Sequence, residues 1–470
     1  MQSYLLKDIS IVNEGKIEVK NIYLKKGRIE RIDNAFGVKE KVHEINGEKK
    51  YLLPGVIDDQ VHFREPGLTH KATIYTESKA AVAGGTTSFM EMPNTIPNAL
   101  TEALLEEKYN LGKNTSLANY SFFMGTSNDN ADDVLQMNKR KKEVCGVKIF
   151  MGSSTGNMLV DNEASLNKIF SESELLIATH CENEKIIKTN YENLKSIKAN
   201  LEASDHPVIR DENACYTSSS FAVSLAQKYN TRLHILHIST AKETELLAND
   251  IPLKDKRITA EVCVHHLNFT ADDYERLDYL IKCNPAIKAP QNKQALWKAL
   301  LDGHLDVIAT DHAPHTLEEK GYIRNESGVL APSPLERAGL RSYEQAHSGL
   351  PLVQHSLLLM LDYYKQGRIS LETIAEKMSH AVAECFRIND RGYIREGYFA
   401  DLVMLDLDKT TPVTKENILY KCAWSPLEGT VFPAAVLRTF VNGNCVYINE
   451  DYGKHSFDES IKGQRLTFNR

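Results

Sequence analysis

The stretch from Gly55 to Gly67, GVIDDQVHFREPG, is an apolar run that ends in side chains able to hold a metal ion or an anion. Residues two apart in a strand point to the same side, so Gln60, His62 and Arg64 share one face of the expected strand. Imidazole is a good ligand for zinc and related ions, whereas the neutral amide of glutamine is a weaker one. We therefore expect a binding site at this strand end, with glutamine where a second histidine would bind a metal more strongly.

Three more apolar runs end in groups that could act together with His62. His180 lies near the end of LLIATHCE, His237 near the end of RLHILHIS, and Asp311 near the end of LDVIATDHAPH. One histidine at a strand end is usually a core residue, but two at equivalent ends favour metal ligation. Burying Asp311 is costly unless the carboxylate is paired or bound to a metal, so we expect it to bind a metal and to move a proton. The alternative is that Asp311 caps the segment that follows it.

Lys148, in GVKIFMG, has two interpretations. A cationic lysine beside metal ions would be repelled by them. If burial lowers its pKa, the neutral amine can react with carbon dioxide and become an anionic carbamate that bridges two metals. The residues alone favour the simpler alternative, a lysine that forms a salt bridge at the rim of the fold.

The elements that must position these residues lie between about residues 55 and 387, where short apolar runs alternate with amphipathic helical stretches. Eight such repeats predict an α/β fold, a (β/α)8 TIM-type barrel. The C-terminal ends of the strands in such a barrel face one mouth, where the active site is built. The candidate residues would meet there from the first, fourth, fifth, sixth and eighth runs. The runs are VIDDQVHF, TTSFMEM, YSFFMGT, GVKIFMG, LLIATHCE, RLHILHIS, ITAEVCVHH and LDVIATDHAPH.

Both ends of the chain are rich in short strand-like segments and lack long helical periods. Each end alone offers few strands with which to close a core, so one small β-sandwich domain built from both ends is the preferred interpretation over two separate β units. We therefore predict residues 1–54 as its N-terminal part, residues 55–387 as the barrel, and residues 388–470 as its C-terminal part with a tail.

Composition narrows the function classes. The formal net charge of −7 argues against a nucleic-acid partner. The first residues, MQSYLLKDIS, lack the features of a signal peptide, and no apolar run is long enough to span a membrane. The eight cysteines form no C-x-x-C pair, so we expect reduced thiols in a cytoplasmic protein. Among them, Cys181 and Cys263 are expected to be small core residues.

Several motifs, taken together in their order, resemble one family over nearly the whole chain. They are PGVIDDQVHFREPG, EMPNT, GVKIFMG, HISTAKE, VHHL, CNPAIK, TDHAPH, REGYFADLVMLD and WSPLEG. The chain resembles the dihydroorotases of the amidohydrolase superfamily, of the longer, type I-like kind. The resemblance implies reversible, zinc-dependent hydrolysis of (S)-dihydroorotate to N-carbamoyl-L-aspartate in pyrimidine (UMP) biosynthesis.

The same resemblance implies a metal site that holds one or two Zn²⁺ ions. His62 and Asp311 would bind the first ion, His180 and His237 the second, and N6-carboxylated Lys148 would bridge both. A hydroxide between the ions would be the nucleophile, and Asp311 would serve as general base and then as general acid.

The resemblance also implies residues that bind the substrate. Arg64, Asn94 and His315 would bind its carboxylate, for which the planar fork of arginine is well suited. Asn284 resembles a further asparagine of the substrate pocket. His265 and His266 resemble the family's His-His-Leu turn and are expected to support the ligands.

Two departures from the family pattern stand out. Gln60 replaces the first histidine of a His-x-His pair, so the first metal would bind more loosely unless the amide or water ligates it. Asp58 lies on the same strand and is expected to support the metal ligands without binding the metal. The segment 328–351 replaces a shorter Gly-rich loop and is interpreted as a lid or an oligomer insertion. The loop after Lys148 carries Ser154 and Thr155, which belong either to a mobile lid or to a plain polar loop.

Two other functions compete with dihydroorotase. Hydantoinases and allantoinases resemble it in the metal site but lack the trio Arg64, Asn94 and His315. A non-catalytic scaffold for aspartate transcarbamoylase is supported by Gln60 alone and opposed by the retained metal-ligand residues. We expect a small-molecule substrate, no nucleic-acid or membrane partner, and a homodimer.

Overall fold

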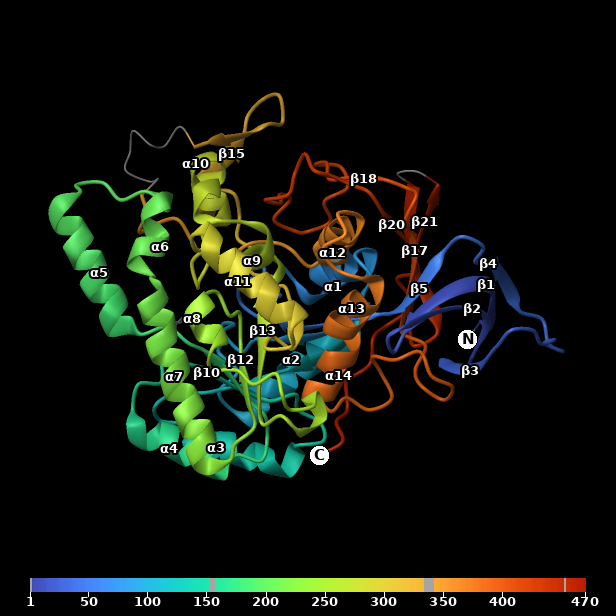
Figure 1. The fold of residues 1–470 in the computed structure, drawn as a ribbon, viewed down its shortest axis with the longest axis horizontal. Helices are drawn as coiled ribbons and strands as arrows, with labels where there is room; N and C mark the ends of the chain where they lie inside the picture. The colour runs from blue at the N-terminus through green and yellow to red at the C-terminus, as the bar shows by residue number, and fades with distance from the viewer. Residues whose placement is uncertain (1, 153–156, 334–341, 452–453) are drawn as a thin grey trace.

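A computed structural model describes residues 2–152, 157–333, 342–451 and 454–470, with a parallel-stranded barrel at its centre (Figure 1). The strands pair side by side in chain order from β6 to β14. Only Phe123 separates β8 from β9, so these two short strands together form the third strand of the barrel. The barrel closes where Val61 pairs in parallel with His312 and the His62 amide donates to the His312 carbonyl at 2.7 Å. The predicted (β/α)8 barrel is therefore confirmed.

The barrel strands coincide with the eight apolar runs of the sequence. Their side chains are buried on both faces, which is why the runs are continuously apolar rather than alternating. Their bounds are β6 Val56–Val61, β7 Thr86–Glu91, β8 Asn119–Phe122, β9 Met124–Gly125, β10 Val147–Phe150, β11 Ile177–His180, β12 Leu233–Ile235, β13 Ile258–Cys263 and β14 Val307–Ala309.

Helices follow the strands and cover the barrel (Figure 1). Local sequence fixes where they begin and end: Thr73 and Thr76 form a capping box at the start of α1, and Asn230 ends α7 in the left-handed conformation. The helices are α1 Ile74–Ala83, α2 Glu102–Thr115, α3 Ala131–Gln136, α4 Glu163–Glu172, α5 Glu184–Ile197, α6 His206–Ile209, α7 Glu212–Tyr229, α8 Ala241–Thr244, α9 Val264–Asn268, α10 Tyr274–Leu277, α11 Pro290–Leu301, α12 Ser356–Lys365, α13 Leu371–Ala375 and α14 Ala381–Phe386.

Both ends of the chain build one mixed sheet beside the barrel, in which nine strands of the described residues take part. Strand β5 of the N-terminal part pairs antiparallel with β17 of the C-terminal part, with Leu52 opposite Met404. Side chains from both parts, such as Leu6 and Leu437, share one core cluster. The single β domain expected from both ends is thus confirmed. Its strands are β1 Tyr4–Asn13, β2 Lys16–Lys25, β3 Arg28–Asp33, β4 His43–Asn46, β5 Tyr51–Pro54, β17 Leu402–Asp406, β20 Ala435–Val441, β21 Asn444–Asp451 and β22 Lys454–Phe457.

The last described residues leave this sheet and return to the barrel. Arg465 forms a parallel bridge with Tyr120, and Leu466 and Phe468 join the core cluster that contains Phe123. Two short pairs lie elsewhere in the C-terminal half: β15 Tyr322–Arg324 with β16 Leu330–Pro332, and β18 Thr411–Pro412 with β19 Val431–Phe432. The predicted domain limits stay a prediction.

Two expectations from composition can be compared with the structure. All eight cysteines are buried and none of them forms a disulfide bond, as expected for reduced thiols. Among the described residues, no helix has the length and apolar character needed to cross a membrane.

Candidate active site

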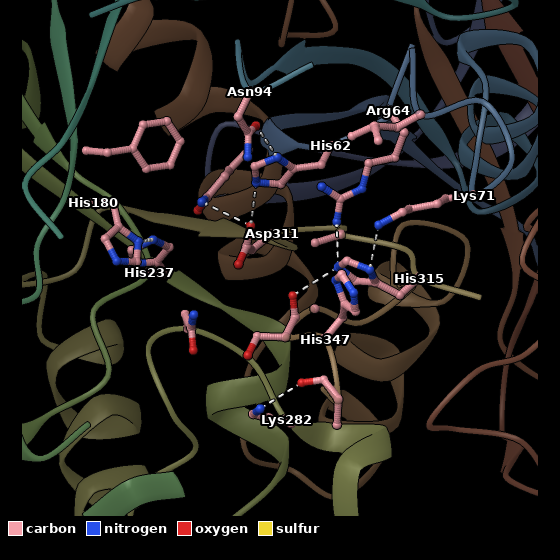
Figure 2. Close-up of a pocket in the computed structure, with 18 of the residues that line it drawn as sticks. His62, Arg64, Lys71, Asn94, His180, His237, Lys282, Asp311, His315 and His347 are labelled. Carbon is pink, nitrogen blue, oxygen red and sulfur yellow. Dashed lines mark hydrogen bonds and ion pairs between the residues drawn. The ribbon is translucent and has the colours of Figure 1, made fainter. Parts of the chain in front are cut away.

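A cavity of about 490 Å³ opens at the C-terminal ends of the barrel strands (Figure 2). Ten of the twelve residues predicted for the site line it. They are Gln60, His62, Arg64, Asn94, Lys148, His180, His237, Asn284, Asp311 and His315. The two others, Ser154 and Thr155, lie outside the described residues. Residues more than 250 positions apart in the chain are thus brought together in one cavity.

Strand ends position the five principal residues. His62 directly follows β6, Lys148 lies inside β10, and His180 ends β11. His237 and Asp311 each lie two residues beyond a strand end and have left-handed backbone, with φ of 40° and 45°. Residues without glycine's freedom are held in this conformation only where surrounding structure compensates for the strain, as it does at functional sites.

Asp311 is the centre of the first cluster in the cavity. Its Oδ1 lies 3.1 Å from His62 Nε2 and accepts a hydrogen bond of the same length from Gln60 Nε2. The other ring nitrogen of His62 lies 2.8 Å from Asn94 Oδ1. Burial raises the pKa of the Asp311 carboxyl, but the hydrogen bond with His62 and the nearby charges of His62, His265 and Lys148 together leave the pKa below its ordinary value. Gln60 thus orients the carboxylate through its amide NH₂, and its Oε1 faces the thiol of Cys263.

His180 and His237 form the second cluster, with ring nitrogens 2.9 Å apart. His180 Nε2 lies 2.9 Å from Glu182 Oε2, and Arg210 pairs with the same carboxylate. Burial raises the pKa of Glu182, but Arg210 and His180 lower it further, to about 2, so the carboxylate is ionised. An ionised outer carboxylate fixes the tautomer and orientation of a histidine, which leaves His180 Nδ1 directed at His237.

Lys148 lies between the two clusters and is almost completely buried. Its amine stands 4.5 Å from the centre of the Phe150 ring, and no ion pair among the described residues includes it. Burial lowers the pKa of Lys148 to about 7, so the neutral amine is well populated at neutral pH.

These residues fit a divalent transition ion. They offer imidazole nitrogens, a carboxylate and an amine with no anionic partner, all buried around one cavity. Imidazole and carboxylate are donors that zinc prefers, and two imidazoles with ring nitrogens 2.9 Å apart line this cavity.

The opposite wall of the cavity is built to attract an anion (Figure 2). Arg64 donates from Nε to the Pro314 carbonyl at 3.2 Å, and its Nη2 lies 3.1 Å from His315 Nε2. Lys71 stands on the other side of the same imidazole, 3.1 Å from Nδ1, and pairs with Glu319. Burial lowers the pKa of Arg64 to about 10, which leaves the guanidinium charged at neutral pH.

Several residues of the cavity were missed from the sequence. Glu182 lies two positions after His180, so the alternation rule applied to the first strand would have found it. Lys71, Lys282 and His347 line the cavity from loops, where no periodic pattern marks them. Residues 344–349 of the unusual segment 328–351 also line the cavity, while residues 334–341 lie outside the described residues.

Two residues next to the cavity make contacts that support its strands, and Asp58 was expected to do so. Asp58 accepts hydrogen bonds from the hydroxyl and amide of Thr310, directly before Asp311. His312 turns away from the cavity, and its Nε2 lies 2.8 Å from Glu77 Oε2. Both contacts tie the first and last strands of the barrel to their surroundings.

Comparisons with known proteins agree with this geometry. Residues 51–446 match the amidohydrolase family. The chain is 30% identical to a dihydroorotase from Pyrococcus abyssi over 94% of this chain and 97% of that one, and 31% identical to a dihydroorotase from Carboxydothermus hydrogenoformans over 94% and 96%. Among solved structures, an L-hydantoinase (dihydropyrimidinase) from Arthrobacter aurescens superimposes with a TM-score of 0.87 and 25% identity, covering 99% of this chain and 100% of that one.

Proposed function

Because the chain belongs to the amidohydrolase family and is a cyclic amide hydrolase, we propose that its substrate is dihydroorotate. The reaction would be the reversible hydrolysis of (S)-dihydroorotate to N-carbamoyl-L-aspartate, a step of pyrimidine biosynthesis. The curated relatives of similar length support this choice, since those cited above are named dihydroorotases.

One observation carries the choice of substrate. Arg64 is a buried guanidinium in the cavity, and no ion pair among the described residues includes it. A buried charge without a counter-ion is costly, so the arginine is suited to a ligand that brings a carboxylate. Dihydroorotate carries such a carboxylate, whereas hydantoin and allantoin do not. His315 and Asn94 line the same cavity and could complete the contact.

The side chains of the cavity have defined parts in this proposal. His62 and Asp311 would hold one Zn²⁺ ion, His180 and His237 a second, and Lys148 would bridge them. Bound zinc supplies a Lewis acid that polarises a carbonyl and lowers the pKa of coordinated water. Asp311 would take a proton from the attacking water and deliver it to the ring nitrogen as the carbon–nitrogen bond breaks.

The bridging role of Lys148 requires a change of charge. We propose that its neutral amine attacks carbon dioxide, so that a nitrogen–carbon bond forms and one proton is released. The product is an N6-carboxylated lysine with a negative charge. The support for this step is a buried amine that has no anionic partner among the described residues.

Hydrolysis of dihydroorotate, followed by the loss of the ring-amide absorbance, tests the proposal on purified protein of known metal content. We expect turnover of dihydroorotate and much weaker turnover of hydantoin and allantoin. In Arg64→Met, kcat/KM for dihydroorotate should fall about 10- to 100-fold, the worth of a charge-assisted contact. Arg140→Met, whose arginine pairs with Glu102 outside the cavity, is the matched control and should change little.

Other outcomes would favour the competing functions. Hydrolysis of hydantoin or allantoin without hydrolysis of dihydroorotate would indicate another cyclic amidohydrolase. Inertness towards all three substrates in metal-replete protein would favour the scaffold interpretation.

The homodimer, the cytoplasmic location and an association with aspartate transcarbamoylase stay proposals. Sedimentation of the purified chain, alone and with that enzyme, tests both assemblies.

A further inference from the structure

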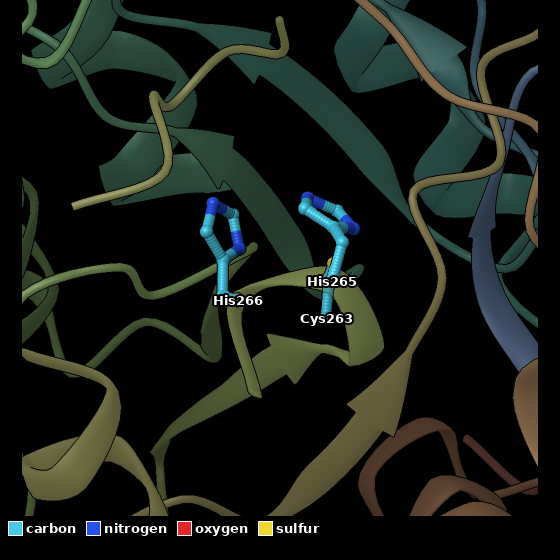
Figure 3. Close-up of side chains that lie close together, drawn as sticks. All are labelled: Cys263, His265 and His266. Atoms are coloured by element: carbon cyan, nitrogen blue, oxygen red, sulfur yellow. The ribbon is translucent and has the colours of Figure 1, made fainter. Parts of the chain in front are cut away.

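A second group of side chains that could bind a metal does not line the cavity (Figure 3). Cys263 ends strand β13, and His265 and His266 lie in the first turn of α9. One ligand atom from each of the three lies within 4.8 Å of the others, and all three side chains are at most 3% exposed. A thiol and two imidazoles are therefore gathered in a dry part of the barrel.

Three of the four ring nitrogens of these two histidines lack a hydrogen-bond partner among the described residues. His266 Nε2 donates to the Pro285 carbonyl at 3.1 Å, so the neutral ring carries its lone pair on Nδ1, and Nδ1 has no hydrogen-bond partner among the described residues. Neither ring nitrogen of His265 has a partner within hydrogen-bond distance there, although the ring faces the backbone carbonyl of Thr310. Buried polar atoms are nearly always paired, and a histidine fixed through its other nitrogen is the usual arrangement of a metal ligand.

The protonation states of the three groups are compatible with metal binding. Burial lowers the pKa of His265 to about 4 and that of His266 well below its ordinary value, so both rings are neutral at neutral pH. Burial raises the pKa of the Cys263 thiol, which therefore keeps its proton until a cation displaces it.

We propose that Cys263, His265 and His266 bind one soft transition-metal ion of the zinc type, at a site separate from the cavity. Binding breaks the sulfur–hydrogen bond of Cys263, forms a sulfur–metal bond and releases one proton to solvent. Sulfur and imidazole nitrogen are donors that bind zinc well, whereas calcium and magnesium prefer oxygen donors. Ligand atoms that form bonds of about 2.0–2.3 Å to one ion stand closer together than 4.8 Å, so the three side chains would move toward one another on binding.

The thiol of Cys263 faces two side-chain oxygens. Gln60 Oε1 and Glu261 Oε1 each lie 3.8 Å from Cys263 Sγ. Because Gln60 also donates to Asp311, its amide would connect the new site to the first cluster of the cavity. The proposal does not depend on the substrate, since it uses none of the residues predicted to bind dihydroorotate.

Cobalt substitution of the full-length protein tests the proposal without an activity assay. Metal-free protein is titrated with Co²⁺, and metal per chain is measured by elemental analysis. The predicted ligands in the cavity include no cysteine, so a thiolate-to-cobalt charge-transfer band in the near ultraviolet reports the new site alone. We expect this band in the wild type, and we expect Zn²⁺ to displace the cobalt and abolish it.

Variants assign the band to the cluster. Cys263→Ser should abolish it and lower the bound metal by one ion per chain, whereas Cys145→Ser, which removes another buried thiol, should leave both unchanged. His266→Gln supplies a second test if Cys263→Ser fails to fold, and it should weaken Co²⁺ binding at this site at least tenfold. The proposal is overturned if the wild type shows no thiolate band or if the band persists in Cys263→Ser.

Discussion

Two lysines in different regions of the barrel are equally buried but differ in their partners. Lys108, on α2 outside the barrel strands, lies 3.0 Å from the Glu91 carboxylate and 5.2 Å from the centre of the Phe122 ring. Lys148, on strand β10 at the cavity, likewise stands over an aromatic ring but has no carboxylate partner among the described residues. Each is 1% exposed, so burial alone does not distinguish them.

The difference lies in how each charge is compensated. Lys108 also donates to the Met92 carbonyl at 2.9 Å, so its ammonium is satisfied within the protein and serves to hold α2 against β7. Lys148 has no such compensation, and its surroundings favour the neutral amine. A buried lysine with its own carboxylate is structural, whereas one without a carboxylate is available for chemistry.

The largest expected effect separates the two lysines by activity. Lys148→Met should lower kcat by about 10³-fold or more, because the proposed bridge between the metal ions would be lost. Its free energy of unfolding should be unchanged or higher, because a buried unpaired amine is removed. Steady-state kinetics and urea unfolding measure both quantities. Activity within tenfold of the wild type would remove Lys148 from the mechanism.

The next effect is on stability. Lys108→Met should lower the free energy of unfolding by about 3–5 kcal/mol, because it leaves the Glu91 carboxylate buried without its partner. The double variant Lys108→Met, Glu91→Gln should recover most of this loss. Urea unfolding measures each variant, and kcat of the folded single variant should stay within a few-fold of the wild type. If the single variant were as stable as the wild type, the pair would not be the structural counterpart of Lys148.

The smallest effect sharpens the description of the first cluster. Gln60→His should tighten metal binding there roughly tenfold, because imidazole is a stronger ligand for zinc than an amide oxygen. Competition with a chelator of known affinity measures the change. Gln345→His, at another residue that lines the same cavity, is the control and should leave metal affinity unchanged. Weaker binding in Gln60→His would mean that the amide, and not an imidazole, is the group this site requires.

The sequence predicted the barrel and most of its mouth because both follow from local patterns. Strands buried on two faces must be continuous apolar runs, and a polar residue that ends such a run must lie at the rim of the sheet. For this reason the pattern brings His62, His180 and Asp311 to the lining of one cavity.

The contacts that the sequence did not predict are made by residues in loops, and they depend on the path that each loop takes in the folded protein. Arg210 lies just beyond helix α6 and reaches Glu182, 28 positions away, through a turn that has no periodic signal. His347 enters the cavity from a segment whose composition suggested only a lid or an oligomer contact. Whether Lys148 has a carboxylate partner likewise depends on which side chains the folded chain brings close to it. The sequence alone does not show this.

The sheet built from both ends of the chain has a consequence for synthesis. Strand β5 is made early, yet its partner β17 follows about 350 residues later, so one edge of β5 stays open while the barrel is translated. Open strand edges can pair with other chains, and contacts between distant residues form slowly. We therefore expect newly made chains to depend on chaperones or on low expression temperature until the C-terminal strands emerge and cover that edge.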